Sequence, residues 1–457
     1  MLRSYQAEGI DWIKKEFSEG TKKILLKLST GAGKTVIFSD ILKGLQKKGN
    51  RGIMLTRGRK LIDQAHQRLK REDVDHGVLM AGHPHYNPNS SIQLCSVDTL
   101  RSRNLIPRAN LIVVDEAHFA ISPTFRNFIS LYPEAYVLGV TATPFVNKSL
   151  RHIADKIICP ISASDLIRDG WLVDGKYYAP KSPDISKVRV KSTGDYDVEE
   201  LSDVMSETQI VGDVVTEWLK LGENRSTFCF CVDIKHSKTV CEAFGKRHVT
   251  AEHCDANTPD NERNAMISRL EKGITKVICS VGTMTTGVDV PSLGCLILAR
   301  PTQSYILHLQ MLGRGTRPFP GKENFLVLDH ASNLMKHGTL RDSDKVEGTL
   351  DGKPTFPKLR TRTCKECFGV FAAGPWACPY CGYKIDKAQE ERELMHVDGS
   401  LEEFKIDPII QRFNELKKIK TLKHYKRGWL FYQMSAEFGE EIANKFVPKR
   451  IVPSWVK

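Results

Sequence analysis

The sequence contains 457 residues, and this length suggests about three domains at roughly 150 residues per domain. Apolar residues make up 41% of the chain, which is enough for more than one buried core and excludes a wholly disordered or fibrous protein. No run of about 18 apolar residues occurs, and the first residues lack the apolar segment of a secretory signal, so we expect no membrane partner. The 67 Lys and Arg residues exceed the 54 Asp and Glu residues, and the net charge of +13 favours a polyanionic partner.

Short apolar runs that end in polar residues recur between Lys22 and about Leu328. The first series comprises residues 22–28, 52–56, 111–114 and 136–140, and the second comprises residues 227–230, 276–279, 295–298 and 325–328. Amphipathic stretches separate these runs, and the alternation is typical of buried parallel strands with flanking helices in an α/β protein. The predicted boundaries are 1–155 for a first α/β domain, 156–210 for a connector, 211–340 for a second α/β domain, 341–360 for a linker, 361–385 for a cysteine-containing module and 386–457 for a basic helical tail.

A glycine-rich segment, Ser29-Thr30-Gly31-Ala32-Gly33-Lys34-Thr35, follows the first predicted strand and precedes a predicted helix. Glycines let a backbone curl so that its amides point at phosphate oxygens, and the following helix N-terminus favours an anion. In such a loop Lys34 reaches the β- and γ-phosphates, and the Thr35 hydroxyl ligates Mg²⁺. The segment departs from the general phosphate-loop pattern, because Leu28 occupies the position of its first glycine. A glycine turn with a surface lysine is the alternative interpretation.

An acidic pair lies in Asp115-Glu116-Ala117-His118, directly after an apolar predicted strand. Asp115 is placed to hold Mg²⁺, directly or through water, and Glu116 to polarise an attacking water. Two adjacent acids after a strand are often only a solvated turn. Together with the glycine-rich loop, however, they predict a nucleotide-hydrolysing site.

Five motifs in sequence order now carry a resemblance to a known family: Gly31-Ala32-Gly33-Lys34-Thr35, Asp115-Glu116-Ala117-His118, Thr141-Ala142-Thr143-Pro144, Thr286-Gly287-Val288-Asp289-Val290-Pro291 and Gln310-Met311-Leu312-Gly313-Arg314-Gly315-Thr316-Arg317. In order and spacing, over about residues 1–330, the chain resembles the superfamily 2 helicases of the DEAH-containing type. The resemblance implies two RecA-like domains with ATP in the cleft between them.

The family's roles carry over to matching positions. Arg3 and Gln6 resemble the motif that reads adenine, although a polar helix cap is the commoner role of such residues. Gly287 and Asp289 match the motif that approaches the ribose and phosphates. Gln310, Arg314 and Arg317 match the last motif, whose arginines stabilise charge on the transferring phosphate, and nucleic-acid contact is the alternative for both arginines. Thr141 and Thr143 are expected to couple hydrolysis to movement, and His118 to bridge toward Gln310 or to be a structural histidine.

The last motif and the following Phe325-Leu326-Val327-Leu328-Asp329 resemble the RadD-like and phage branch-migration helicases, as does Tyr425-Lys426-Arg427-Gly428-Trp429 near the C-terminus. The resemblance implies DNA as partner, at branches or junctions between single strands and duplex, with repair and single-strand-binding proteins as candidate protein partners. Arg57 stands where the family often has His and Asp98 where it often has Gln. Candidate contacts to the DNA backbone, each with a solvated surface residue as the alternative, are Arg57, Arg59, Lys60, Asp98, Thr99, Leu100, Arg101, Thr285 and Thr286.

Four of the 12 cysteines form two Cys-x-x-Cys pairs, Cys364 with Cys367 and Cys378 with Cys381. Two such pairs suit tetrahedral thiolate ligation, so we predict a structural Zn²⁺ site there, with a redox pair as the alternative. The other eight cysteines are expected to be reduced and packed, as in the cytoplasm of a bacterial or phage-infected cell.

The C-terminal tail combines cations with aromatic residues between Gln411 and Leu430. Its seven basic residues are Arg412, Lys417, Lys418, Lys420, Lys423, Lys426 and Arg427, and His424, Tyr425 and Trp429 are interleaved. Cations that neutralise phosphates and rings that stack on bases suit single-stranded DNA. Phe413, Leu416, Ile419 and Leu422 recur at helical spacing, so an amphipathic helix packed on the body, with a solvated lysine face, is the alternative.

The sequence thus predicts an ATP- and Mg²⁺-dependent DNA helicase or translocase. An ATP-switched binding module, a double-strand translocase that does not separate strands, and an RNA helicase remain as alternatives.

Overall fold

The computed structural model describes residues 2–144, 149–179, 188–191, 195–205, 208–285, 287–346, 350–351, 361–364, 366–372, 377–384, 416 and 427–438. Residues 1–384 form one compact unit and residues 385–457 a second one.

The first α/β domain is built on a seven-stranded parallel sheet with the strand order β3-β4-β2-β5-β6-β1-β7. Its strands are β1 (Lys23–Lys27), β2 (Gly52–Thr56), β3 (Gly77–Leu79), β4 (Ile92–Ser96), β5 (Leu111–Asp115), β6 (Tyr136–Thr141) and β7 (Lys156–Ile158). Because β6 lies between β1 and β5, the segments that follow these three strands meet at one edge of the sheet. This edge brings the glycine-rich loop, the acidic pair and Thr141 together.

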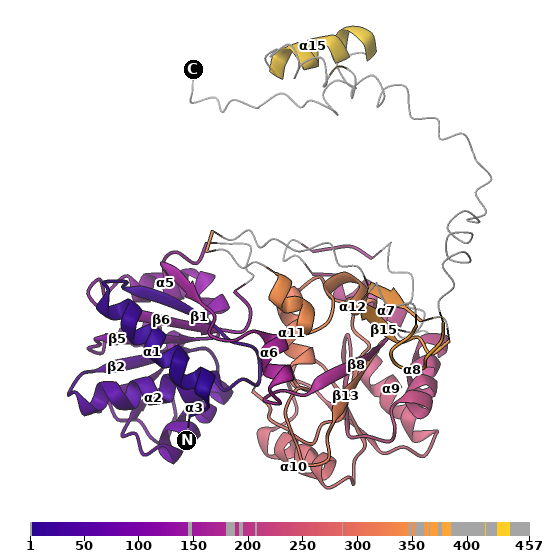
Figure 1. The fold of residues 1–457 in the computed structure, drawn as a ribbon, viewed down its shortest axis with the longest axis horizontal. Coiled ribbons are helices and arrows are strands. Elements are labelled where there is room, and N and C mark those ends of the chain that lie inside the picture. The colour runs from indigo at the N-terminus through magenta and orange to yellow at the C-terminus, as the bar shows by residue number, and fades with distance from the viewer. Residues whose placement is uncertain are drawn as a thin grey trace. The chain divides into compact units, whose positions relative to one another are not determined.

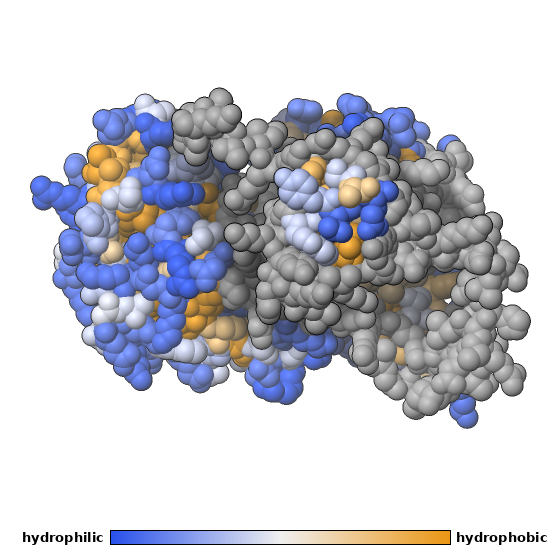
Figure 2. Space-filling model, turned by 90° about the horizontal axis from the view of Figure 1, so that it is seen from above, coloured by the Kyte–Doolittle hydropathy of each residue, from blue (hydrophilic) through white to orange (hydrophobic). Residues whose placement is uncertain are grey.

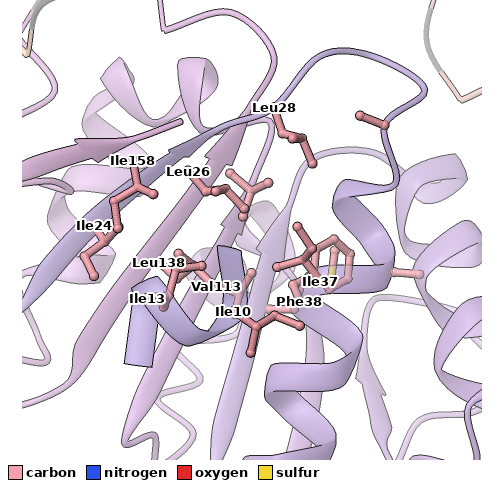
Figure 3. Packing of buried hydrophobic residues seen from close by; sticks show 14 of the residues in the cluster. Ile10, Ile13, Ile24, Leu26, Leu28, Ile37, Phe38, Val113, Leu138 and Ile158 are labelled. Atoms are coloured by element: carbon pink, nitrogen blue, oxygen red, sulfur yellow. The ribbon is translucent and has the colours of Figure 1, made fainter. Parts of the chain in front are cut away.

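Helices cover the first sheet because their apolar residues recur at helical spacing. They are α1 (Ser4–Ser18), α2 (Lys34–Lys47), α3 (Arg59–Arg71), α4 (Val97–Ser102), the 3₁₀ helix η1 (Ala117–Ile121) and α5 (Pro123–Ile129). Figure 3 shows Ile10 and Ile13 of α1 and Ile37 and Phe38 of α2 beside Leu26 of β1, and all five side chains are buried. The glycine-rich loop therefore joins two elements that this core holds firmly.

The second α/β domain has a six-stranded parallel sheet with the order β10-β11-β9-β12-β13-β8. Its strands are β8 (Asp174–Tyr178), β9 (Thr227–Phe230), β10 (Ala251–Cys254), β11 (Val277–Ser280), β12 (Cys295–Leu298) and β13 (Asn324–Asp329). The helix α6 (Ala163–Arg168) connects the two domains. The helices that follow are α7 (Val198–Met205), α8 (Thr208–Leu221), α9 (Ile234–Gly245), α10 (Asp260–Glu271), α11 (Tyr305–Leu312), α12 (Asn333–His337) and the 3₁₀ helix η2 (Arg341–Lys345). Figure 1 shows the two sheet domains as two lobes, each with helices packed around its strands. The predicted fold class is confirmed.

The stretch expected as a connector, residues 156–210, contributes to both domains. Its β7 pairs with β1 in the first sheet, and its β8 pairs with β13 at the edge of the second sheet. Periodicity did not predict these strands, because β7 has three residues and β8 reads Asp-Gly-Lys-Tyr-Tyr.

The sequence predicts a linker over residues 341–360. The part of this stretch that the structure describes packs against the first domain. The Asp344 carboxylate accepts hydrogen bonds from the backbone N–H groups of Ala163 and Ser164, at 2.8 Å each, and so caps α6. The Leu150 backbone N–H donates to the Leu350 carbonyl at 2.7 Å. Leu340, Val346 and Leu350 are buried in the apolar clusters of the first domain. Residues 338–346 and 350–351, here called the return segment, therefore join the two domains.

The cysteine module continues the second sheet at its edge. Its strands β14 (Thr361–Thr363) and β15 (Val370–Ala372) pair in antiparallel fashion. The Ala179 backbone N–H donates to the Phe368 carbonyl at 3.0 Å, and the rings of Tyr178 and Tyr380 lie 5.7 Å apart. The module thus covers the open edge of β8.

The second unit is described only at Leu416, which is buried, and in the helix α15 (Arg427–Phe438). The tail residues Arg412, Phe413, Lys417, Lys418, Ile419, Lys420, Leu422, Lys423, His424, Tyr425 and Lys426 lie outside the described residues. Among the residues that the structure describes, no helix combines the length and the apolar content that a membrane crossing needs. Figure 2 shows mainly hydrophilic side chains on the described surface, with smaller apolar areas between them.

Candidate active site

The glycine-rich loop curls tightly between β1 and α2. Gly31 and Gly33 both have left-handed backbone conformations, with φ of +86° and +82°, which side chains rarely adopt. Gly33 caps α2, whose first residue is Lys34. The first backbone N–H groups of a helix have no intrahelical acceptor, and the helix dipole adds positive potential there. The turn that carries Thr30 and Ala32, together with the first residues of α2, Lys34 and Thr35, is therefore suited to bind phosphate.

Leu28 explains the departure from the general phosphate-loop pattern. Its side chain is fully buried in the core of the first domain, and its backbone N–H donates to the Thr141 carbonyl at 3.0 Å. The Leu28 carbonyl accepts a hydrogen bond of 3.3 Å from Lys34 Nζ. Leu28 thus directly follows β1 and continues its hydrogen bonding to β6, and the loop curls only after this position.

The start of α1 is attached to the glycine-rich loop. The Gln6 side chain accepts from the Arg3 backbone N–H at 3.0 Å and donates to the Ala32 carbonyl at 3.3 Å. The Tyr5 hydroxyl donates to the same carbonyl at 2.8 Å. The Arg3 guanidinium lies 4.5 Å from the centre of the Trp171 ring, a cation–π contact. In this structure Gln6 acts as a helix cap that also holds the loop, and sequence reasoning missed Tyr5 and Trp171.

The acidic pair lies at the end of β5, close to β6. Glu116 has a left-handed backbone, with φ of +48°, and its N–H donates to Asp115 Oδ1 at 2.9 Å. His118 Nδ1 lies 3.1 Å from Thr141 Oγ1 and 3.4 Å from Glu116 Oε2. His118 Nε2 is buried without a hydrogen-bond partner among the described residues, so the bridge expected toward Gln310 is not formed here.

Thr141 and Thr143 are both buried at the end of β6. The Thr141 hydroxyl accepts a hydrogen bond of 3.1 Å from the Thr143 backbone N–H while it also contacts His118. The motif therefore lies behind the acidic pair and contacts it through His118.

The second domain supplies two arginines from the turn after α11. Arg314 donates to the Val288 carbonyl and, at 3.4 Å, to the carbonyl of the buried Gln310. Arg317 donates to Asp289 Oδ2 at 2.7 Å, and about a third of its side chain is exposed. Gly287 has a left-handed backbone, with φ of +65°. Thr286 lies outside the described residues.

The two domains meet at this site. A Cβ atom added to Gly313 would lie 2.6 Å from the Thr30 side chain, and one added to Gly31 would lie 3.1 Å from Thr316 Oγ1. Glycine at these positions therefore permits the last motif to approach the glycine-rich loop closely.

The electrostatics of the site combine both domains. Burial lowers the pKa of the Lys34 ammonium, Glu116 and Asp115 oppose that shift, and Arg314 and Arg317 add to it. Burial, reinforced by Glu116, raises the pKa of Asp115 to about 7. Burial and then Arg317 lower the pKa of Arg314 to about 10. The charges of Lys34, the acidic pair and both arginines thus lie close enough to influence one another's ionisation.

These residues fit a nucleoside triphosphate with Mg²⁺. The glycine-rich loop and Lys34 would hold the phosphates, Thr35 and Asp115 the Mg²⁺, and Arg3 and Gln6 lie at the start of α1 beside the loop. Bound Mg²⁺ supplies positive charge to the phosphates and would favour the ionised form of Asp115. In such a complex Glu116 would orient and deprotonate a water, and the arginines would balance negative charge on the phosphate that is transferred.

The candidate DNA contacts divide into exposed and buried residues. Arg57 and Asp98 lie on neighbouring strand ends as an exposed ion pair, with 3.9 Å between Nε and Oδ2. Thr99 and Leu100 are buried, so they do not contact a ligand on this surface. Arg59 and Arg101 are exposed, and Thr285 is buried.

The four cysteines of the predicted zinc site converge, although they come from two turns. Sγ of Cys364 lies 3.7 Å from Sγ of Cys381, and Sγ of Cys367 lies 3.6 Å from Sγ of Cys378. Tetrahedral ligation with a Zn–S distance of about 2.3 Å requires sulfur atoms about 3.8 Å apart. The four thiols therefore fit Zn²⁺.

Three other cysteines also lie together, in the core of the second domain. Sγ of Cys229 is 3.7 Å from Sγ of Cys231. Cys279 of β11 lies opposite Cys229 of β9. Hydrogen bonding with Cys229 and Cys231, together with burial, keeps the pKa of the Cys279 thiol well above its usual value. These thiols belong to the apolar cluster under α8 and α9 and pack as small apolar groups.

Comparisons with known proteins agree with this architecture. Residues 1–146 match the family described as type III restriction enzyme, res subunit, and residues 210–318 match the helicase conserved C-terminal domain. A solved fragment of an HsdR subunit of a type I restriction enzyme from Vibrio vulnificus YJ016 has a similar fold, with a TM-score of 0.60 and 20% identity over 77% of this chain and 70% of that one.

Two relatives extend the similarity. A 51.5 kDa protein of a Lactococcus phage (isolate 7-9) is 28% identical over 90% of this chain and 89% of its own length. The ATP-dependent helicase IRC3 of Saccharomyces cerevisiae is 29% identical over 72% of this chain, which spans 51% of IRC3. Neither the matched families nor these relatives specify the RadD-like subgroup, which stays a prediction. With two parallel-sheet domains, matches to the res-subunit family and to the helicase C-terminal family, and a helicase relative, the chain belongs to the superfamily 2 helicases, which are ATP-hydrolysing enzymes.

Proposed function

We propose that this helicase couples ATP hydrolysis to the remodelling or unwinding of branched or forked DNA in repair, recombination or replication. The observation that carries the proposal is the meeting of the two domains at the glycine-rich loop, where Gly313 of the last motif approaches Thr30 and Thr316 approaches Gly31. A site completed from two domains links hydrolysis to their relative movement. We also propose that it acts in the cytoplasm of a bacterial or phage-infected cell.

DNA as the polymer is supported by charge and by relatives. The exposed Arg57, Arg59 and Arg101 lie at the start of α3 and on α4, near the carboxyl edge of the first sheet. Cations on that edge can neutralise phosphates without reading sequence. The ATP-dependent DNA helicase uvsW of phage T4 is 21% identical over 53% of this chain. Branched DNA as the preferred structure is our inference, and repair or single-strand-binding proteins are candidate partners.

The first experiment measures ATP hydrolysis with forked, three-way and four-way DNA and with duplex RNA as control. We expect Mg²⁺-dependent hydrolysis that DNA stimulates. Lys34→Ala should abolish turnover, because the loop loses its phosphate-binding cation. Glu116→Gln should bind ATP and hydrolyse it slowly, because the water loses its base. Stimulation by RNA rather than DNA would contradict the proposed polymer.

The second experiment follows strand separation on the same substrates. Release of a labelled strand from forks supports unwinding. ATP hydrolysis with displacement of a bound protein from duplex but no strand release indicates a double-strand translocase. ATP-dependent retention of DNA without turnover indicates a binding module.

We further propose that Cys364, Cys367, Cys378 and Cys381 bind one structural Zn²⁺. With four thiolates the coordination is complete, so this metal has no open position for catalysis. Elemental analysis of reduced, freshly purified protein should find one zinc per chain. Its absence there would refute the site.

A further inference from the structure

A glutamine of the first domain is hydrogen-bonded to the segment of the second domain that holds both arginines. Gln64 lies on the exposed face of α3, and its Nε2 donates to the Gly287 carbonyl at 2.7 Å. The helix that presents it is anchored in the core of the first domain through Ile62, Ala65 and Leu69, all buried. A movement of the Gly287 segment relative to α3 therefore stretches this hydrogen bond.

The residues after Gly287 bind the arginines directly. The Val288 carbonyl accepts from Arg314, and the Asp289 carboxylate accepts from Arg317 at 2.7 Å. Gly287 itself has a left-handed backbone, which gives its carbonyl a direction that few other residues could provide. The position of residues 287–289 thus decides where both guanidinium groups lie.

The same helix begins at the surface that we propose for DNA. Arg57 lies two residues before Arg59, the first residue of α3, and Gly58 caps the helix between them. The Arg59 guanidinium donates to the Gly82 carbonyl at 3.0 Å, which ties the start of the helix to the adjacent loop. One packed helix therefore carries exposed cations at its start and a contact to the arginine-holding segment five residues later.

We propose that Gln64 is a positioning residue that couples DNA binding at the start of α3 to the placement of Arg314 and Arg317. DNA that holds α3 favours the arrangement in which Gln64 reaches Gly287, and this arrangement keeps the arginines at the glycine-rich loop. ATP favours the same arrangement through the arginines. The inference rests on the proposed function, because it needs DNA-stimulated hydrolysis.

The expected effect follows from the strength of one neutral hydrogen bond. Such a bond contributes about 1 kcal/mol, which corresponds to about a fivefold change in an equilibrium between two arrangements. Coupling between two ligands is reciprocal, so loss of the bond should weaken the effect of ATP on DNA affinity by the same factor as the effect of DNA on ATP affinity.

The test compares Gln64→Glu with Gln67→Glu in the full-length protein. Gln67 is exposed on the same helix, one turn away, and within the described part of the chain no hydrogen bond of its side chain is found. Both variants add one negative charge to α3, but only the first removes the donor to Gly287. Gln64→Ala and Gln67→Ala repeat the comparison without the charge.

Two quantities are measured for each variant: forked-DNA affinity with and without a non-hydrolysable ATP analogue, and hydrolysis with and without DNA. In Gln64→Glu and Gln64→Ala the gain in DNA affinity caused by the analogue should fall about fivefold, and the DNA-stimulated rate should fall further than the DNA-free rate. Thermal midpoints should match those of the Gln67 variants, since α3 keeps its buried face.

The outcomes separate this inference from the proposed function. If DNA does not stimulate the unmodified protein, the proposed function fails first. If DNA stimulates it and the Gln64 variants behave like the Gln67 variants, Gln64 does not couple the two sites and the inference is wrong. A lower thermal midpoint with equal losses of rate with and without DNA would assign Gln64 a structural role only.

Discussion

Arg314 and Arg317 belong to one motif, but their surroundings differ. Arg314 is partly buried against the Val288 carbonyl, and the loss of solvent around it lowers its pKa to about 10. Arg317 is partly exposed and its partner is the half-exposed Asp289. A guanidinium held by backbone carbonyls is fixed in place, whereas one paired with a carboxylate can exchange that carboxylate for a phosphate. Spacing in the motif does not distinguish these roles.

Arg317→Ala should therefore give a folded protein that binds ATP and hydrolyses it slowly. We expect a loss of turnover on the order of 10³, because the charge that forms on the transferring phosphate is no longer balanced. ATP binding and single-turnover hydrolysis measure the two properties separately. Arg317→Lys serves as control, since it keeps the charge but not the planar fork. Unchanged turnover in Arg317→Ala would remove the assignment.

Asp115 should make stability depend on pH in the absence of nucleotide and Mg²⁺. Burial raises its pKa to about 7, above the value of an unfolded chain, so the folded state favours the protonated form. This contribution is fully present below the unfolded pKa and is lost as the pH rises through about 7. Asp115→Asn should raise the thermal midpoint at pH 8 and change it little at pH 5. A shift of equal size at both pH values would contradict this ionisation.

At the scale of elements, the glycine-rich loop is held from three sides. Core packing holds β1 and α2, Gln6 and Tyr5 contact the Ala32 carbonyl, and Gly313 approaches Thr30. A Cβ atom at Gly33 would lie 2.5 Å from Gln6 Nε2. Glycine at this position thus permits both the left-handed backbone and the close approach of α1.

The cysteine module should stabilise the second domain through strand β8. Its contacts to Tyr178 and Ala179 cover an edge strand whose backbone groups otherwise face water. Cys367→Ser, or removal of zinc by a chelator, should lower the thermal midpoint and increase hydrogen exchange in residues 174–179. Cys159→Ser, at an exposed thiol outside both cysteine groups, is the control. Unchanged exchange in β8 would show that the module folds independently of the sheet.

The return segment permits a comparison of two aspartates. Asp344 caps the N-terminus of α6 with two backbone hydrogen bonds, whereas Asp351 forms an exposed ion pair with Arg151. Asp344→Ala should cost about 1 kcal/mol of unfolding free energy, as loss of a helix cap does. Asp351→Ala should leave stability nearly unchanged, because exposed ion pairs are screened by solvent. Denaturant unfolding of both variants measures this contrast, and equal losses would contradict it.

At the scale of the whole molecule, the nucleotide motifs all precede residue 318, and the basic tail lies in a separate compact unit. Removal of residues 401–457 should therefore leave hydrolysis without DNA largely intact. Binding to forked DNA should weaken and its salt dependence should flatten, because fewer counterions are released. Titrations of the folded, truncated protein at several salt concentrations test this. An unchanged affinity and salt slope would assign the tail a structural role.

Short segments of the sequence by themselves determined many of the strands and most of the chemistry of the site. Runs such as Leu111–Val114 and Cys295–Leu298 are apolar throughout, which is typical of strands buried on both faces of a parallel sheet. The glycine-rich loop, the acidic pair and the paired cysteines could be predicted because their chemistry requires fixed residues at short spacing. The short strands β3, β7 and β8 could not, because their pattern is too brief or too polar.

Only the tertiary structure decided which distant residues meet. Gln64 reaches Gly287 across 223 positions, Thr30 meets Gly313, and the return segment packs on the first domain. Such contacts depend on how the two sheet domains pack against each other, and a single surface glutamine or aspartate carries no periodic signal of its partner. The chemistry of the site could therefore be read from local motifs, whereas its coupling between domains depends on long-range contacts that local propensity does not encode.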